Sequence, residues 1–281
     1  MSGWAPGLVV MVDWSAASGR GPARESADRC WLAWGTGRER PAPEYFRTRD
    51  DCVARLSALL RVHAGPALFG FDFPIGYPRD EQGRAVLPEG RALVEHVTAK
   101  VVDVNGMSNR FDVARSLNRE IRAVTGRAEG PLWGCVGSVA GAGLTSTKTR
   151  EHGVAEYRPA ELRLRAQGRN IQSPWKLFGA GSVGSQSLVG LPAVERVLAQ
   201  AGERGRLWPF EAVDRADAVV VAEIWPSLGD FRDERYLRLS VKDARQVAAM
   251  RDWALGRPEE LQRAIFAVPA GSEVGWILGA P

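Results

Sequence analysis

The sequence contains few of the residues that mark secreted or zinc-binding proteins. Its 281 residues include three cysteines and three histidines. Cys30, Cys52 and Cys135 are odd in number, lie far apart and form no C-x-x-C pair, so we expect reduced thiols in a cytoplasmic protein. The histidines are too dispersed for a zinc signature.

Long apolar runs and a strong charge bias are also absent. No run approaches the roughly 18 to 20 residues of a membrane span, and the first residues lack the basic region and apolar core of a signal peptide. We therefore expect a soluble protein with no membrane partner. Lys and Arg (37) exceed Asp and Glu (33) by a net charge of +4, which permits nucleic acid or another phosphate substrate without requiring one.

The hydrophobic pattern predicts an α/β domain. Short apolar runs bounded by turn residues indicate buried strands at 8–12, 30–34, 44–47, 67–71 and 218–225. The first three predict an antiparallel meander. Helical spacing predicts helices from about Thr48 to Gly65, from 242 to 255 and from 258 to 266.

The middle of the chain is less regular. We predict an α-rich insertion at 79–207 within a single domain spanning 1–281, with helices near 89–101, 109–124 and 191–201. Two Gly-rich tracts, at 134–143 and 179–190, are expected to form loops that line a site, because glycine lets the backbone approach a ligand closely.

Acidic residues in strand contexts are the main functional signal. Asp13 and Asp72 follow buried apolar runs, and Glu223 lies inside another, although acidic side chains are depleted in strands and rarely buried unpaired. Clustered carboxylates repel one another unless a cation neutralises them, so their convergence would create a site for Mg²⁺ or Mn²⁺. Asp243, at the start of the predicted 242–255 helix, is a fourth candidate ligand.

Each of these residues also has a structural interpretation. Asp243 could cap its helix or complement the helix dipole. Asp13 and Asp72 could stabilise turns, and Glu223 could form an ion pair with a basic residue of the insertion. The distances among the carboxylates decide between these interpretations.

Four short motifs occur in the order found in RNase-H-like predicted nucleases. They are Val12-Asp13-Trp14-Ser15, Phe71-Asp72-Phe73-Pro74-Ile75-Gly76, Ala222-Glu223-Ile224-Trp225-Pro226-Ser227 and Gly275-Trp276-Ile277-Leu278. The chain thereby resembles the domain-of-unknown-function family numbered four-twenty-nine. Residues 90–205 match weakly, and the acidic run usual in the terminal helix is reduced here to Asp243.

The resemblance implies an RNase-H-like mixed sheet, the meander plus parallel strands, flanked by helices. It also implies metal-dependent hydrolysis of phosphodiester bonds by a nuclease or phosphodiesterase, with Asp13, Asp72, Glu223 and Asp243 as catalytic metal ligands. Basic residues could neutralise substrate phosphate, and small residues could approach it. These substrate-binding candidates are Ser15, Arg110, Arg158, Lys176, Gly181 and Ser182.

Other functions remain open. Gly179–Gly184 matches G-x-G-x-x-G, but no convincing strand precedes it and no suitable acidic strand follows, which argues against a dinucleotide site and leaves a phosphate-binding loop or a simple turn. The enzyme could instead act on a small phosphorylated molecule or nucleotide, for example in cofactor biosynthesis. A non-catalytic binding module with the same fold is a third hypothesis.

Overall fold

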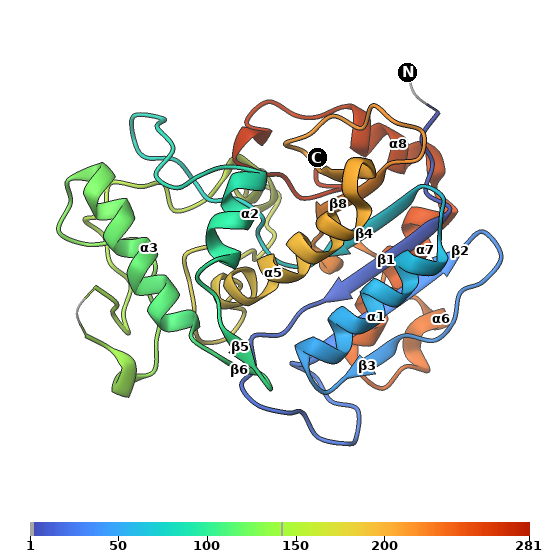
Figure 1. Ribbon diagram of the computed structural model, residues 1–281, viewed down its shortest axis with the longest axis horizontal. Helices are drawn as coiled ribbons and strands as arrows, with labels where there is room; N and C mark the ends of the chain where they lie inside the picture. The colour runs from blue at the N-terminus through green and yellow to red at the C-terminus, as the bar shows by residue number, and fades with distance from the viewer. Residues whose placement is uncertain (1–2, 142) are drawn as a thin grey trace.

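Six strands form one mixed sheet in the computed structural model, which describes residues 3–141 and 143–281 (Figure 1). Their order is β3-β2-β1-β4-β8-β7. The bounds are β1 (Leu8–Asp13), β2 (Cys30–Thr36), β3 (Glu44–Phe46), β4 (Ala67–Phe71), β7 (Gly205–Leu207) and β8 (Val219–Glu223). Strands β1 to β3 pair antiparallel, whereas β1, β4, β8 and β7 pair parallel. The predicted meander and the two later strands are confirmed, and β7 was not predicted.

Eight α-helices are found in the described part of the chain. They are α1 (Arg49–Val62), α2 (Arg91–Thr98), α3 (Arg110–Thr125), α4 (Pro159–Ala166), α5 (Gly184–Ala201), α6 (Glu234–Leu237), α7 (Lys242–Gly256) and α8 (Pro258–Phe266). The predicted start of α1 is confirmed, because the Thr48 side chain caps it by accepting a hydrogen bond from the Asp51 N–H at 3.1 Å. None of the described helices is long and apolar enough to cross a membrane.

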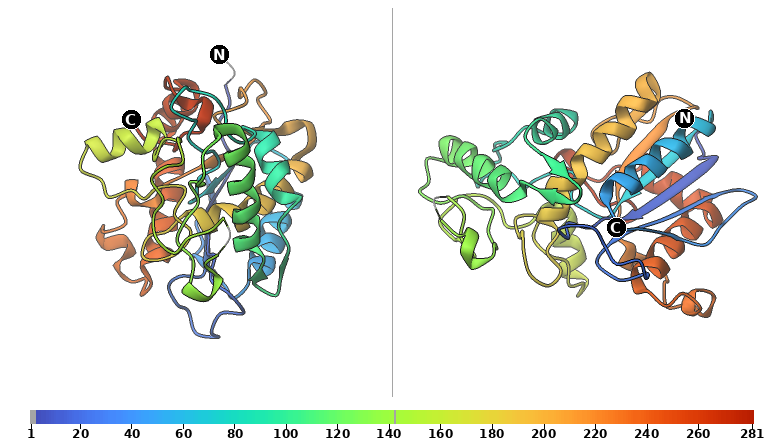
Figure 2. Two further views of the ribbon diagram at one scale, coloured as in Figure 1. Left: turned by 90° about the vertical axis from the view of Figure 1, so that its left-hand side faces the viewer. Right: turned by 60° about the horizontal axis from the view of Figure 1, so that its bottom comes forward.

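Helices cover both faces of the sheet. Helices α1 and α5 pack on one face, and α7 and α8 lie on the other (Figures 1 and 2). Strand β1 shows how the sequence separates the two layers: Val10 and Val12 point into the first core, whereas Val9 and Met11 point into the second. A strand that is buried on both faces has apolar residues at every position, which explains the uninterrupted apolar run at 8–12.

The range 79–207 contains two kinds of structure. Helices α2 and α3, with the small hairpin β5 (Asp103–Val104) and β6 (Met107–Ser108), lie beyond the end of the sheet (Figure 1). Helix α5 instead packs against α1, and β7 is a strand of the sheet. The part of the predicted Gly-rich loop at 134–143 that is described includes a short 3-10 helix, Gly137–Val139, while residue 142 lies outside the described residues.

The second Gly-rich tract is only partly a loop. Residues 184–190 were expected to be loop, but they form the first turns of α5. The helix starts early because Leu188 and Val189 bury their side chains in the first core, and Gly190 fits against Phe73. A Cβ at Gly190 would lie 2.3 Å from Phe73 Cε1, so this glycine allows close packing rather than an irregular backbone.

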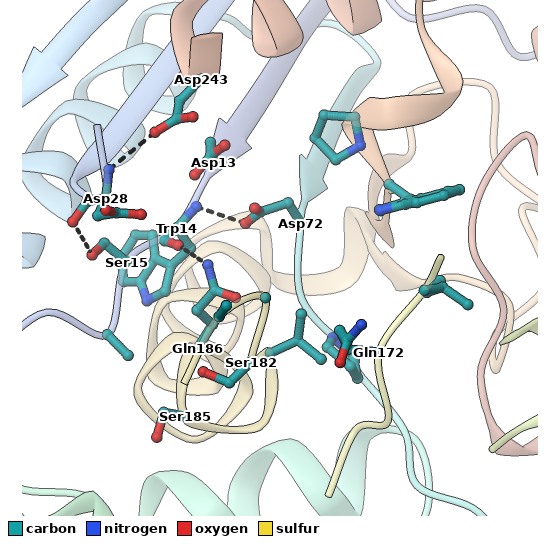
Figure 3. Close-up of a pocket in the computed structure, with 18 of the residues that line it drawn as sticks. Asp13, Trp14, Ser15, Asp28, Asp72, Gln172, Ser182, Ser185, Gln186 and Asp243 are labelled. Carbon is teal, nitrogen blue, oxygen red and sulfur yellow. Dashed lines mark hydrogen bonds between the residues drawn. The ribbon is translucent and has the colours of Figure 1, made fainter. Parts of the chain in front are cut away.

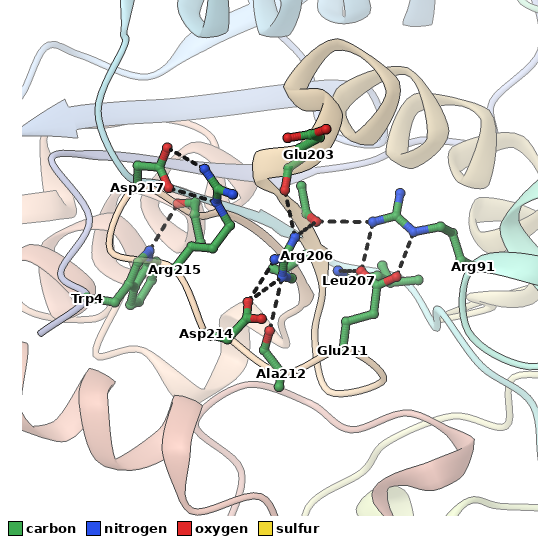
Figure 4. A network of polar contacts seen from close by, with 12 residues as sticks. Trp4, Arg91, Glu203, Arg206, Leu207, Glu211, Ala212, Asp214, Arg215 and Asp217 are labelled. Atoms are coloured by element: carbon green, nitrogen blue, oxygen red, sulfur yellow. Dashed lines mark hydrogen bonds and ion pairs between the residues drawn. The ribbon is translucent and has the colours of Figure 1, made fainter. Parts of the chain in front are cut away.

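A polar network fixes the edge strand β7 (Figure 4). Arg91 of α2 donates to Glu211 at 2.7 Å and to the Gly205 carbonyl at 3.2 Å. The other carboxylate oxygen of Glu211 accepts the Leu207 N–H at 2.7 Å, and Arg206 pairs with Asp214. These bonds join α2 to the sheet through groups that an edge strand would otherwise leave unpaired.

The substitution Gly190→Ala should destabilise the fold by about 1–3 kcal/mol, because the added methyl group meets the Phe73 ring in a packed core. Gly256→Ala is the matched control, since Gly256 is also helical but has nothing within 4 Å of the position that its new methyl group would take. Urea unfolding of both variants measures the difference. Equal stability of the two variants would contradict the packing of α5 on Phe73.

Candidate active site

Two adjacent parallel strands end in aspartates. Asp13 is the last residue of β1, Asp72 directly follows β4, and the register pairs Val12 with Phe71. The Asp72 N–H donates to the Val12 carbonyl at 3.2 Å, which extends the pairing to the base of the site. Ligands of open α/β sheets bind at the carboxyl ends of their strands, and both carboxylates lie at such ends.

Asp72 is held by the backbone of the neighbouring strand. Its Oδ1 accepts the Trp14 N–H at 2.6 Å (Figure 3). The side chain is enclosed by protein yet keeps part of its surface open to the cavity. Burial raises the pKa of Asp72 to about 8; the Trp14 N–H opposes this rise, and the negative charges of Asp243 and Glu223 add to it.

Asp13 and Asp243 complete a group of three neighbouring aspartates. Burial, followed by repulsion from Asp72 and Asp243, raises the pKa of Asp13 well above its ordinary value. Burial also raises the pKa of Asp243, although its Oδ2 accepts the Asp28 N–H at 3.1 Å. No Lys, Arg or His side chain forms an ion pair with these three aspartates anywhere in residues 3–141 and 143–281.

A cavity of about 940 Å³ opens beside the carboxylates. Asp13, Asp72 and Asp243 line it from the sheet and α7, and the loop before α5 lines it from the opposite side. In Figure 3, Asp243 and Asp13 lie at one end and Ser182 and Ser185 at the other, with the Trp14 ring between them. The cavity is of the size that encloses a small ligand.

Glu223 differs from the three aspartates because it has a cationic partner. The Arg158 guanidinium binds both of its oxygens, at 2.7 and 2.6 Å, and the Ile75 N–H donates to Oε2 at 3.1 Å. Arg158 also binds Glu161 and is 0% exposed. Burial alone would lower the pKa of Arg158, but the carboxylates of Glu161 and Glu223 raise it, so the guanidinium stays charged.

These contacts match the ion-pair interpretation of Glu223 rather than its role as a metal ligand. Both oxygens of Glu223 are already bound, although the residue borders the cavity. Arg158 was expected to contact substrate, but in this arrangement its side chain is fully buried, is bound by two carboxylates and does not line the cavity. The short motifs gave no sign of Arg158 as the partner of Glu223.

The other predicted substrate contacts divide into two groups. Ser15, Arg110, Gly181 and Ser182 line the cavity. Lys176 does not line it, because its Nζ donates to the Ala180 carbonyl at 2.8 Å and so braces the Gly-rich loop from behind.

Three cavity residues were missed by sequence reasoning. Asp28 has a positive φ of 58°, donates its N–H to Asp243 and accepts the Ser15 hydroxyl at 2.6 Å. Gln186 donates to the Trp14 carbonyl, and Ser185 lies in the same turn of α5. No periodic pattern marks Asp28, whereas an earlier start of α5 would have placed Ser185 and Gln186 at the site.

The carboxylate oxygens at the site are of the chemical type that a hard divalent cation prefers, but few of them lie close together. Carboxylate oxygens are the ligands that Mg²⁺ and Mn²⁺ prefer. As arranged, no three His, Cys, Asp or Glu side chains of the described residues converge closely enough to hold one ion. Mg²⁺ commonly uses only one or two carboxylates and fills its remaining positions with water and substrate phosphate, and adjacent Asp13 and Asp72 can supply that minimum.

Comparison with known proteins adds no further information. The chain matches no family model, no curated protein and no solved structure. The fold and the site are therefore interpreted from the geometry of this chain.

Without divalent metal, the Asp72 carboxyl group should make the protein less stable as pH rises. Its folded pKa of about 8 exceeds the ordinary value of 3.8, so between these values the folded state holds a proton that the unfolded state has released. Denaturant unfolding in a chelating buffer should show stability falling across this window. In Asp72→Asn, which keeps an oxygen for the Trp14 N–H, the fall should be smaller by about 1 kcal/mol or more. Identical pH profiles for the two proteins would contradict the shifted pKa.

Arg158→Met should cost about 3–5 kcal/mol of stability, because it leaves Glu161 and Glu223 buried without their cation. Arg257→Met is the matched control. The exposed ion pair between Arg257 and Glu260 should contribute little to the free energy of unfolding. Thermal and denaturant unfolding of both variants test the pair, and a stable Arg158→Met protein would show that the buried pair does not hold the site together.

Proposed function

We propose that this protein is a metal-dependent phosphodiesterase or nuclease that works at Asp13, Asp72 and Asp243. The observation that carries the proposal is the adjacency of Asp13 and Asp72 at the ends of two parallel strands, facing a cavity and without a cationic partner in the part of the chain that the structure describes. Such a pair attracts a divalent cation, because burial and the repulsion among the nearby carboxylates disfavour uncompensated negative charge, as both raised pKa values indicate. Glu223 is not included among the proposed metal ligands, because its carboxylate is already paired with Arg158.

The strand order supports an RNase-H-like fold. An antiparallel meander, β3-β2-β1, continues into parallel β4 and β8, and the acidic residues lie on the first strand, after the fourth and on a late helix. This is the arrangement that the resemblance to the predicted nucleases leads one to expect. Strand β7 extends the sheet on the far side of β8.

The chemistry would be hydrolysis at phosphorus. A water oxygen bonds to phosphorus, the bond to the leaving oxygen breaks, and the proton ends on that oxygen. A bound Mg²⁺ or Mn²⁺ would neutralise phosphate charge and make its water more acidic. Asp13 and Asp72 would hold the cation, and Asp243, fixed by the Asp28 N–H, would orient the attacking water.

The cavity favours a second candidate, hydrolysis of a small phosphorylated molecule or nucleotide. Its volume of about 940 Å³ suits a compact ligand, and a net charge of +4 gives no strong attraction to a nucleic-acid backbone. A panel of single-stranded DNA, RNA, dinucleotides and a simple aryl phosphodiester separates these substrates.

Hydrolysis of that panel should require Mg²⁺ or Mn²⁺ and should fall by about 100-fold or more in Asp13→Asn and in Asp72→Asn, because each removes a cation ligand. Asp217→Asn is the matched control: Asp217 lies on the surface, paired with Arg215, and should leave the rate unchanged.

Two results would contradict the proposal. One is full activity in either cavity variant. The other is a wild-type protein that binds neither cation at millimolar concentration, which would favour a non-catalytic binding module.

A further inference from the structure

Three residues that line the cavity each have a buried polar side-chain atom with no hydrogen-bond partner among the described residues. These atoms are Trp14 Nε1, Arg110 Nε and Ser185 Oγ. Trp14 is 1% exposed and the whole Ser185 residue 3% exposed, so bulk water does not readily serve them. Buried donors left without acceptors are costly, and three on one cavity point to a ligand that supplies acceptors.

The first turn of α5 adds backbone donors to the same wall. The Gly184 N–H donates to the Lys176 carbonyl and the Ser187 N–H to the Val183 carbonyl. The helix has no internal acceptor for the N–H groups of Ser185 and Gln186. An 18-residue helix also directs the positive end of its dipole here.

Arg110 brings a positive charge without an acidic partner. Its Nη1 donates to the hydroxyls of Ser18 and Ser108, both neutral. The carboxylate of Asp103 also acts on Arg110, but it is paired with the neighbouring Arg49. Burial and the Arg49 charge lower the pKa of Arg110, and the charge of Asp103 opposes this only in part.

We propose that the cavity wall at the start of α5 is an oxyanion site for a phosphate group of the substrate, formed by the first turn of α5, Arg110 and Trp14 Nε1. In Figure 3, Ser182 and Ser185 lie beyond the Trp14 ring from Asp13 and Asp243, so a phosphate bound at the start of α5 is not the one under attack at those aspartates. The inference rests on the proposed hydrolase function and narrows its substrate to a compact phosphodiester that carries a further, terminal phosphate.

Calorimetric titration with inorganic phosphate in a chelating buffer tests the oxyanion site apart from any metal. Wild-type protein should bind phosphate. Arg110→Gln should weaken binding by about 10-fold or more, since it removes a charge-assisted bond. Ser185→Ala should weaken it roughly 2- to 10-fold. Because the Ser185 hydroxyl has no partner, its removal should not impair folding, and this variant keeps the test valid if Arg110→Gln is unstable.

Arg119→Gln is the matched control, because Arg119 lies on the same helix α3, is exposed and does not line the cavity. It should bind phosphate like the wild type. Absence of phosphate binding overturns the oxyanion site even if hydrolysis occurs. Wild-type affinity for phosphate in both the Arg110 and the Ser185 variants overturns it as well. Phosphate binding that depends on Arg110, in a protein that hydrolyses nothing, upholds the site and refutes the hydrolase proposal.

Discussion

The site depends on the enclosure of Asp13 and Asp72 side by side, with no cationic side chain among the described residues to pair with them. Parallel pairing of β1 and β4 forces the two carboxyl groups to the same edge of the sheet, and α7 brings Asp243 to them. Two nearby carboxylates can bind a proton or a cation, and the raised pKa values of Asp13 and Asp72 favour a bound proton in the absence of metal. A cation from solution would be the alternative to the bound proton.

Glu223, at the end of a third strand, β8, has its negative charge neutralised by an arginine. Glu223 binds Arg158 from the region between β4 and β7, and Arg158 is shared with Glu161. The C-terminal segment closes over this pair: the Leu278 N–H donates to the Glu223 carbonyl, and a Cβ at Gly275 would lie 2.8 Å from Arg158 Nη1. Three of the motifs that carry the family resemblance therefore meet around one ion pair, which gives them a structural role independent of catalysis.

Much of the sheet could be predicted because burial on both faces produces uninterrupted apolar runs, as at Val9 to Val12. The positions of Asp13 and Asp72 followed from the ends of those runs. The start of α5 could not be predicted, because Gly184 and Gly190 read as loop residues, and only the contact with Phe73 explains Gly190 within a helix. An ion pair between Glu223 and a basic residue of the insertion was one of the interpretations, but the sequence did not single out Arg158, which lies 65 positions away. The sequence indicated Arg110 and the 179–184 loop as candidate phosphate contacts, but it could not join them to Trp14 and Ser185 in the proposed oxyanion site, because these residues come from distant segments.

A crystal soaked in Mn²⁺ tests the central claim most directly, because anomalous scattering locates the ion without reference to activity. The claim predicts an ion bound by carboxylate oxygens of Asp13 and Asp72, with water completing its coordination. A well-ordered crystal with no ion between these carboxylates, or with the ion bound to Glu223 in place of Arg158, would contradict it.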